Sequence, residues 1–261
     1  MSRRPGAAGD EVPAVAAGAV GPDYADLTFP PPPPGRPYIV TNMVSSADGK
    51  VVVEGDEGGL GSPTDRRLMR ELRSHADIVL NGAGTLRASG SSSRLGVRAL
   101  EDRRTRRGRA RLPVAAVLSA SGDLPLDRDF FRARDFPAVV YVSDAAAPER
   151  RRGLEATGRP LHVLPGTNPL DAMVRHMRES LGAELVLVEG GPALNGALFD
   201  RDLIDEYFLT LGARLAGGSG VPAAIEGRAA PTREGLRLLD LVSAYANVET
   251  SELYLRYRVR R

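Results

Sequence analysis

Short apolar runs alternate with amphipathic segments over most of this chain. Runs of three to eight mostly apolar residues are typical of strands and occur at residues 38–44, 78–80, 114–118, 138–142, 161–164, 185–188, 204–211 and 253–259. Apolar residues three or four apart predict helices at residues 63–75, 169–181 and 192–199. The first of these helices has clear start signals, because Ser62 is a good N-cap and Pro63 suits the first turn.

The alternation of strands and helices predicts an α/β fold. Strands joined by helices form a mainly parallel sheet with helices on both faces. The last two runs follow each other without a helical segment, so we expect an antiparallel edge at the C-terminal end. Residues 1–35 are rich in Gly, Ala and Pro, and they bury too little apolar surface to offset the entropy of ordering. We therefore expect a flexible tail at residues 1–35 and a single domain at residues 36–261.

Composition excludes several classes of protein. The 261 residues contain no cysteine, which rules out disulfides, a thiolate nucleophile and cysteine-based zinc sites. No apolar run is long enough to cross a membrane, and the N-terminus lacks the pattern of a secretory signal, so we expect a cytoplasmic protein. The three histidines, His75, His162 and His176, show no metal-ligand spacing; we expect no metal and treat all three as structural or surface residues.

Positive charge is concentrated in one arginine-rich stretch. Eight arginines lie between Arg94 and Arg111, although the formal net charge is only +2 and Lys50 is the single lysine. The stretch lacks the interleaved aromatic residues of a nucleic-acid platform. We therefore expect a solvated basic loop and no nucleic-acid partner. One or two of these arginines could bind a phosphorylated small molecule.

The most informative segment is the end of the run at residues 185–188. Glu189 follows this run, then Gly190, Gly191 and Pro192 lead into a helical segment that includes Ala193 and Leu194. A buried strand that turns into a helix presents free backbone N–H groups, and glycine lets a phosphate approach them closely. The segment predicts a phosphate-binding turn beside a carboxylate. A carboxylate at the end of an apolar strand is costly unless it is paired or faces a cleft.

Other polar turns follow other predicted strands. Asn42 and the turn at residues 45–50 follow the first strand, a turn containing Gly84 and Thr85 follows the second, and Ser119 follows the third. Ligands of open α/β sheets bind beyond the carboxyl ends of the strands. These turns therefore predict one shared cleft.

The order and the residues of these motifs resemble those of the riboflavin-pathway pyrimidine reductases. The resemblance lies in residues 36–43, 46–50, 60–63, 72–77, 82–85, 188–192 and 203–206. It implies a dihydrofolate-reductase-like fold and an enzyme that transfers hydride from NADPH to a ribosylamino-pyrimidine 5′-phosphate, opening the ribose to a ribityl chain. It also implies a homodimer. Asn42 occurs at this position in stand-alone members and lysine in bifunctional ones, which favours a stand-alone reductase.

The resemblance assigns roles residue by residue. Thr85 and Gly84, the turn at residues 190–194 and Ser119 face the cofactor. Arg73 contacts the substrate phosphate, Glu189 faces the substrate, and Asn42 and Asp48 complete the catalytic set.

Simpler roles stay open for several of these residues. Arg73 could serve only the helix dipole, Asp48 only a turn and Thr85 only an N-cap.

Two departures from the family pattern leave the substrate open. Glu57 stands just before the turn at residues 58–63, where an acid would repel a phosphate. After Thr85 the usual acidic residues are absent, so that Arg94 or Arg98 would have to supply the phosphate-binding arginine. Dihydrofolate or a pterin is the alternative substrate class, and a nucleotide-binding protein without catalysis is the alternative from another class.

Overall fold

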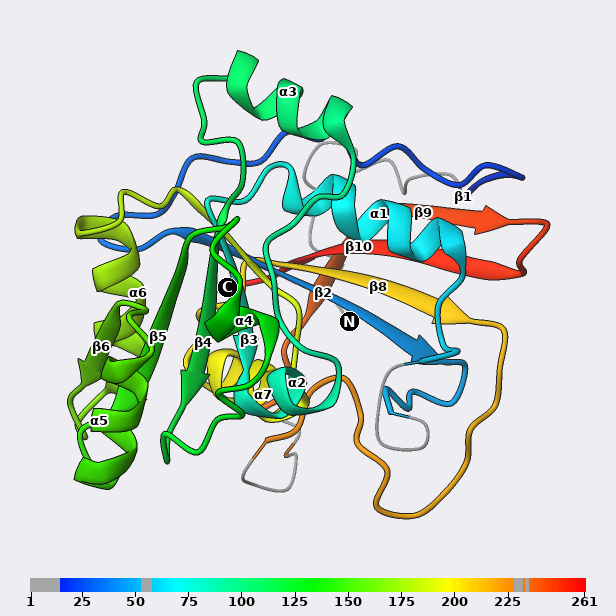
Figure 1. Ribbon diagram of the computed structural model, residues 1–261. Coiled ribbons are helices and arrows are strands. Elements are labelled where there is room, and N and C mark those ends of the chain that lie inside the picture. Colours follow the sequence, from blue (N-terminus) through cyan, green and yellow to red (C-terminus); the bar gives the residue numbers. More distant parts are fainter. Residues whose placement is uncertain (1–14, 53–57, 228–231, 233–234) are drawn as a thin grey trace, which may run out of the picture.

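The computed structural model describes residues 15–52, 58–227, 232 and 235–261 as one ten-stranded sheet with helices on both faces (Figure 1). The strands are β1 (Val15–Gly18), β2 (Tyr38–Ser46), β3 (Ile78–Gly82), β4 (Val114–Ser119), β5 (Ala138–Ser143), β6 (Leu161–Leu164), β7 (Leu185–Val188), β8 (Glu206–Gly212), β9 (Leu239–Asn247) and β10 (Glu252–Val259). The helices are α1 (Pro63–Arg73), α2 (Ala83–Ala88), α3 (Arg98–Arg106), α4 (Asp129–Arg132), α5 (Pro148–Ala156), α6 (Pro169–Glu179) and α7 (Pro192–Asp200).

The strand order is β1-β9-β10-β8-β2-β7-β3-β4-β5-β6. The strands from β8 to β6 in this order are parallel, whereas β10 is antiparallel to both β8 and β9. The predicted mainly parallel sheet with an antiparallel C-terminal edge is therefore confirmed. Among the helices of the described ranges, none is long and apolar enough to cross a membrane.

Several elements differ from the sequence prediction, which also lacked β1, α2 and α4. β9 was not predicted, because polar residues interrupt its alternation and its pairing with β10 shifts register between Arg256 and Tyr257. α5 was also not predicted. The expected basic loop contains α3, which buries Leu100 and Arg104 against the domain while Arg98 and Arg106 are exposed.

Alternating side chains of the central strands fill two separate cores. On β5, Val139 and Tyr141 pack with α6 and α7 on one face of the sheet. Val140 and Val142 pack on the opposite face, with residues around α2 to α5. α1 covers the same opposite face over β2 and β7. This two-sided burial is why the central strands read as nearly continuous apolar runs in the sequence.

The expectation of a flexible tail is wrong for residues 15–35. β1 pairs in parallel with β9, and Tyr24 and Ala25 are buried. The Tyr24 backbone N–H donates to Glu71, and its carbonyl accepts from His75 Nε2 at 2.8 Å. Burial lowers the pKa of His75 to about 4, so His75 is a neutral core residue at pH 7. Specific contacts thus hold a segment whose composition alone predicts disorder; residues 1–14 lie outside the described ranges.

Two buried carboxylates hold the start of β8. Asp205 accepts two hydrogen bonds from the Arg36 guanidinium, at 2.7 and 2.8 Å, and one from the Ile39 backbone N–H. Glu206 is fully buried and accepts from Arg256 Nε at 2.7 Å and from the Tyr38 hydroxyl at 3.0 Å. Because both acids are fully paired, they fix β8 against β2.

Arg104 of α3 caps the C-terminal end of α1. Its side chain is only 1% exposed and donates to the carbonyl oxygens of Ser74, Ala76 and Ala110 at 3.1, 2.5 and 2.8 Å. Burial lowers the pKa of Arg104 to about 10, which keeps it charged at neutral pH. The cation therefore satisfies the Ser74 carbonyl at the C-cap of α1 and the carbonyls of Ala76 and Ala110 beyond the helix, and it complements the helix dipole.

Replacing Arg104 with methionine should destabilise the domain. Methionine fills much of the same space but leaves several buried carbonyls without donors, so the free energy of unfolding should fall by about 2–4 kcal/mol. Urea unfolding followed by circular dichroism measures this change. The matched control is Arg98→Met on the same helix, where the side chain is 87% exposed and we expect a change within about 0.5 kcal/mol. Equal effects of the two substitutions would contradict the capping role.

Candidate active site

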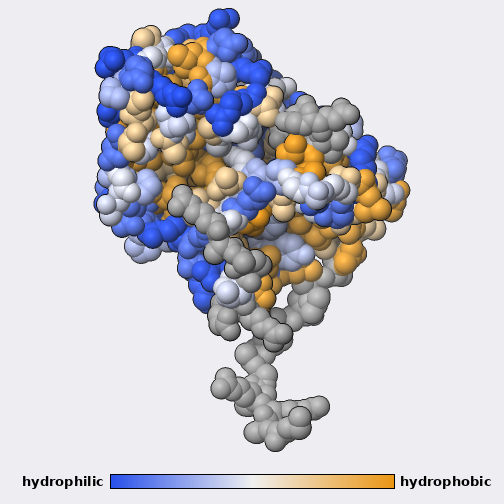
Figure 2. Space-filling model, turned by 90° about the horizontal axis from the view of Figure 1, so that it is seen from below, coloured by the Kyte–Doolittle hydropathy of each residue, from blue (hydrophilic) through white to orange (hydrophobic). Residues whose placement is uncertain are grey.

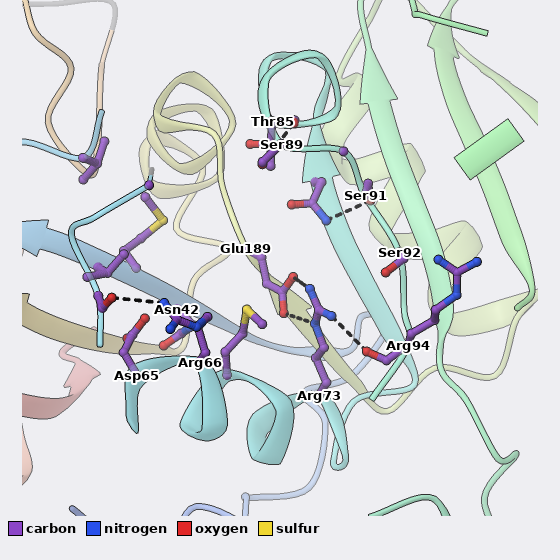
Figure 3. A pocket seen from close by; sticks show the side chains of 18 of the residues that line it. Asn42, Asp65, Arg66, Arg73, Thr85, Ser89, Ser91, Ser92, Arg94 and Glu189 are labelled. Atoms are coloured by element: carbon purple, nitrogen blue, oxygen red, sulfur yellow. Dashed lines mark hydrogen bonds and ion pairs between the residues drawn. The ribbon is translucent and has the colours of Figure 1, made fainter. Parts of the chain in front are cut away.

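A cleft of about 710 Å³ opens at the carboxyl ends of β2, β3 and β7 (Figure 3). One wall is the face of α1 that carries Arg66, Met69 and Arg73, and the opposite wall is the loop at residues 89–94. Asn42, Asn81, Thr85 and Glu189 come from the strand ends and the turns after them. The predicted shared cleft agrees with this arrangement for Asn42, Thr85 and Glu189, but not for the turn at residues 45–50 or for Ser119, which do not line the cleft.

Arg73 and Glu189 form a bidentate ion pair in the cleft. Arg73 Nε donates to Glu189 Oε1 at 2.6 Å, and Arg73 Nη2 donates to Glu189 Oε2 at 2.7 Å. Arg73 Nη1 donates to the backbone carbonyl of Arg94 at 3.0 Å. The side chains of Arg73 and Glu189 are only 14% and 8% exposed, so the pair is well shielded from water. The carboxylate at the end of β7 is therefore both paired and in a cleft.

Asn42 and Asn81 supply amide groups at neighbouring strand ends. Asn42 is partly exposed to the cleft, and its side chain makes no hydrogen bond with the described part of the chain. Asn81 is 2% exposed and donates to Ser91 Oγ at 3.0 Å. This bond fixes the loop at residues 89–94 while leaving the Ser91 hydroxyl proton available to a ligand.

Sequence reasoning missed Asn81, Ser91 and Arg66. The spacing of Arg66 and Arg73 on the predicted helix was a usable signal, because residues seven apart lie on one face of a helix. Asn81 and Ser91 carry no comparable pattern, since their pairing depends on how the loop returns over β3.

Two glycine-rich turns lie against each other beside the cleft. The Gly82 backbone N–H donates to the Gly190 carbonyl at 2.8 Å. A Cβ on either Gly190 or Gly191 would lie 3.4 Å from Thr85 Oγ1, and Gly190 has a φ of 103° that favours glycine. The Gly190–Gly191 peptide bond is cis. The turns of the β3–α2 and β7–α7 units, which hold Thr85 and residues 190–194, are thus in direct contact.

Both helices that follow these turns begin without a side-chain cap. Gly82 precedes α2 and Gly191 precedes α7, and neither position provides a side-chain hydrogen bond to the helix N-terminus. Gly84 in the first turn of α2 has open space where a side chain would point. The first N–H groups of two adjacent helices are consequently available to an anion.

Arg94 lines the cleft but points its charge away from Glu189. Its guanidinium donates to Asp135 at 2.6 and 2.8 Å and to Asp129 at 3.0 Å, and it stacks over Phe136. The hydrogen bonds that Arg94 donates to the Asp135 carboxylate raise the pKa of Arg94. Two carboxylates therefore already compensate this cation, and its backbone carbonyl, rather than its side chain, contacts Arg73.

Arg98 is 87% exposed and pairs with Asp102. Glu57 lies outside the described residues.

Asp48 and Ser119 are engaged in turns away from the cleft lining. The Asp48 carboxylate accepts from Ser46 Oγ at 2.6 Å and from the backbone N–H groups of Ala216 and Gly217 at 3.0 and 2.8 Å. These hydrogen bonds, led by that of Ser46, hold the pKa of Asp48 well below its usual range. Ser119 Oγ accepts from the Gly122 N–H at 3.1 Å. The geometry thus gives Asp48 the turn role that the sequence left open.

The chain belongs to the RibD C-terminal domain family, which it matches over residues 37–247. It is 26% identical over 228 residues to the 2,5-diamino-6-ribosylamino-4(3H)-pyrimidinone 5′-phosphate reductase of Methanothermobacter thermautotrophicus, covering 86% of this chain and 99% of that protein. It is 28% identical over 192 residues to the riboflavin biosynthesis protein RibD of Escherichia coli, covering 70% of this chain and 50% of that protein.

Solved structures share the fold. A pyrimidine reductase-like protein from Corynebacterium diphtheriae superposes with a TM-score of 0.77 at 22% identity, covering 86% of this chain and 92% of that one. RibD from Acinetobacter baumannii superposes with a TM-score of 0.69 at 18% identity, covering 87% of this chain and 59% of that one. The sequence resemblance to riboflavin-pathway reductases is confirmed by the family match.

Replacing Asp48 with asparagine should loosen the segment that follows β8. Asparagine keeps the size but removes the charge that strengthens both backbone hydrogen bonds. We expect limited proteolysis at residues 213–227 to become severalfold faster at pH 7 and at pH 5, because the carboxylate is ionised throughout this range. Asp123→Asn, in another exposed turn, is the control. A large loss of turnover with unchanged proteolysis would instead support a catalytic role for Asp48.

Proposed function

We propose that this chain is an NADPH-dependent reductase that converts a 5′-phosphorylated ribosylamino-pyrimidine to its ribitylamino form. The observation that carries the proposal is a cleft lined by Glu189, Asn42, Arg73 and Thr85, with two glycine-rich turns in contact with each other beside it. Membership of the family supports it, as do the names of relatives that act on such a phosphate. The proposal retains the expectation of a cytoplasmic enzyme.

The two turns fit the diphosphate of a dinucleotide. Gly84 leaves open space beside the backbone, Gly190 and Gly191 bring their backbone against Thr85, and the uncapped starts of α2 and α7 offer N–H groups to an anion. The residues that would hold the cofactor are Gly84, Thr85, Gly190, Gly191, Pro192, Ala193 and Leu194, with Ser119 shaping the turn after β4. When bound, NADPH supplies the hydride. The protein positions the substrate: Asn42 and Glu189 orient the heterocycle on the side of Thr85 away from the cofactor diphosphate.

A reductase of another heterocycle, such as dihydrofolate or a pterin, is the second candidate. One observation favours it: the two arginines predicted to bind a substrate phosphate are both paired with carboxylates, Arg73 with Glu189 and Arg94 with Asp129 and Asp135. A substrate without a phosphate would leave both arrangements intact. The two candidates share the cofactor but differ in the turnover of the phosphorylated pyrimidine.

The antiparallel edge of the sheet is the proposed contact for a homodimer. Cross-strand partners share one face, which places apolar rows on the α7 side of the sheet: Leu211, Leu253 and Ala246, then Leu209, Leu255 and Ala244, then Tyr207, Tyr257 and Leu241. Leu253 is 38% exposed. Figure 2 shows hydrophobic residues gathered on the side of the molecule where these strands lie. In a dimer with a twofold axis, the same apolar rows of a second copy would pack against this face.

An aspartate in the middle row should prevent dimerisation. Leu255→Asp would place a charge at the centre of the apolar face, and we expect a change from dimer to monomer in size-exclusion chromatography with light scattering. Leu181→Asp, at a partly exposed leucine after α6, is the control and should remain dimeric. A monomeric wild-type protein would contradict the dimer.

The function is tested by mixing the protein with NADPH and the phosphorylated pyrimidine. We expect loss of the reduced-nicotinamide absorbance, whereas turnover of dihydrofolate alone would favour the second candidate. If neither substrate is turned over and NADPH does not raise the melting temperature, a protein without this catalysis is favoured.

The cofactor contacts are tested by adding a side chain at an open glycine. In Gly84→Val, the new Cβ would have no atom within 4 Å, so the fold should persist while the added side chain obstructs the cofactor. We expect the Kd for NADPH to rise about tenfold or more, as for a contact worth at least 1.4 kcal/mol. Gly153→Val in α5, another helical glycine with space around it, should bind NADPH normally. Equal affinities for the two variants would remove Gly84 from the cofactor site.

A further inference from the structure

The connection between β8 and β9 returns to the start of α7 and packs against it (Figure 1). Asn195 Nδ2 of α7 donates to the Ala224 carbonyl at 2.9 Å, and the Glu226 backbone N–H donates to the Pro192 carbonyl at 3.1 Å. Gly196 lies so close to Glu226 that a Cβ at this position would overlap the Glu226 carbonyl oxygen. Two hydrogen bonds and one close backbone approach thus attach this connection to the first turns of α7.

The same connection contacts the loop after β2 through residues 221–226, here called the bridging segment. The Val51 backbone N–H donates to the Pro222 carbonyl at 3.1 Å, and Lys50 and Ala223 form an antiparallel β-bridge. Val51 is 4% exposed and lines the cleft. The bridging segment therefore joins one wall of the cleft to the helix start that we propose binds the cofactor diphosphate.

Asn195 is fully buried and links three further points of the sheet and helix. Thr41 Oγ1 of β2 lies 3.2 Å from Asn195 Oδ1 and 3.3 Å from the Val188 carbonyl oxygen of β7, and its one hydroxyl proton serves both acceptors. Thr41 and Val188 directly precede Asn42 and Glu189 in the sequence. The Asn195 amide group therefore ties α7 to the base of two side chains that line the cleft.

Resting on the proposed function, we propose that Asn195 is a positioning residue that locks the bridging segment to α7 and thereby fixes both the start of α7 and the cleft wall at Val51. An amide suits this role, because it donates to the Ala224 carbonyl and accepts from Thr41 at the same time. A carbonyl that loses its donor in a shielded site is strongly disfavoured. Loss of the Asn195 donor should therefore release the bridging segment and loosen both of the elements that it joins.

An aspartate at position 195 makes this contact dependent on pH. The aspartate has the shape of asparagine, but its ionised form offers no donor to the Ala224 carbonyl. Complete burial raises the pKa of a carboxyl group by about 3–5 units, so that Asn195→Asp should ionise near neutral pH. Below that pKa the protonated carboxyl donates its O–H in place of the amide N–H. Acidic pH should therefore restore the contact.

The groups that contact Asn195 do not titrate in this range. They are the Thr41 hydroxyl and the backbone carbonyl of Ala224. Among the charged residues beside these contacts, Glu189 is paired with Arg73, and Glu226 meets α7 through its backbone. Comparison with the wild type at each pH removes the effects of all other titrating groups, including the phosphates of the cofactor.

The experiment measures the Kd of NADP+, which is stable in acid, for the wild type and Asn195→Asp at pH 8 and pH 5.5. We expect the Kd of the variant to exceed that of the wild type by about tenfold or more at pH 8, and by less than about twofold at pH 5.5. Asn168→Asp is the control, because this exposed residue before α6 makes no capping hydrogen bond. Its Kd should equal that of the wild type at both pH values.

Two results would overturn the inference. An unchanged Kd at pH 8 together with a lower melting temperature would show that Asn195 serves stability alone. An equal loss of affinity at both pH values would show that the donor to Ala224 is not what positions α7.

Hydrogen–deuterium exchange tests the link without any cofactor. At pH 8, we expect Asn195→Asp to exchange faster than the wild type at the Glu226 N–H and also at the Val51 N–H, with both rates returning to those of the wild type at pH 5.5. Faster exchange at Glu226 alone would contradict a single locked unit. If the wild type does not bind NADP+, the proposed function fails, and the exchange rates still decide the role of Asn195.

Discussion

The central constraint of this molecule is the parallel pairing of β7 with both β2 and β3. Because β7 is only four residues long and buried on both sides, its position admits no slip of register without exposing apolar side chains. This pairing brings Asn42, Gly82 and Glu189 to one edge of the sheet. The cleft, the contact between the glycine-rich turns and the ion pair with α1 all follow from that placement.

Charge compensation is the second organising principle. Arginine supplies nearly all of the positive charge, and buried arginines meet carboxylates, as with Arg256 and Glu206, or carbonyl oxygens, as with Arg104. The planar fork of donors suits both kinds of partner, which lysine would serve less well. In the cleft, Arg73 and Arg94 are likewise paired with carboxylates, Arg73 with Glu189 and Arg94 with Asp129 and Asp135.

The sequence predicted the central strands well because each is apolar on both faces. Strand ends also predicted that Asn42, Thr85 and Glu189 share one cleft, whereas Arg73 entered the expected site only through the resemblance to the family. The sequence could not predict that Arg94 turns toward Asp129 and Asp135, which lie 35 and 41 residues later in the chain, at the start of α4 and just after it. The turn role of Asp48 could not be predicted either, because it depends on the backbone N–H groups of Ala216 and Gly217. No local sequence pattern relates these residues to Asp48.

The segment before β2 belongs to the folded unit, although it precedes the region that matches the family. The family match starts at residue 37, yet Tyr24 packs edge-on against Phe208, Phe29 packs against His75, and Arg256 stacks over Phe29. These contacts seal the side of the sheet behind α1, the helix that carries Arg73. A boundary drawn from shared sequence alone would thus cut through a hydrophobic core, and the limits of a family need not be the limits of a stable domain.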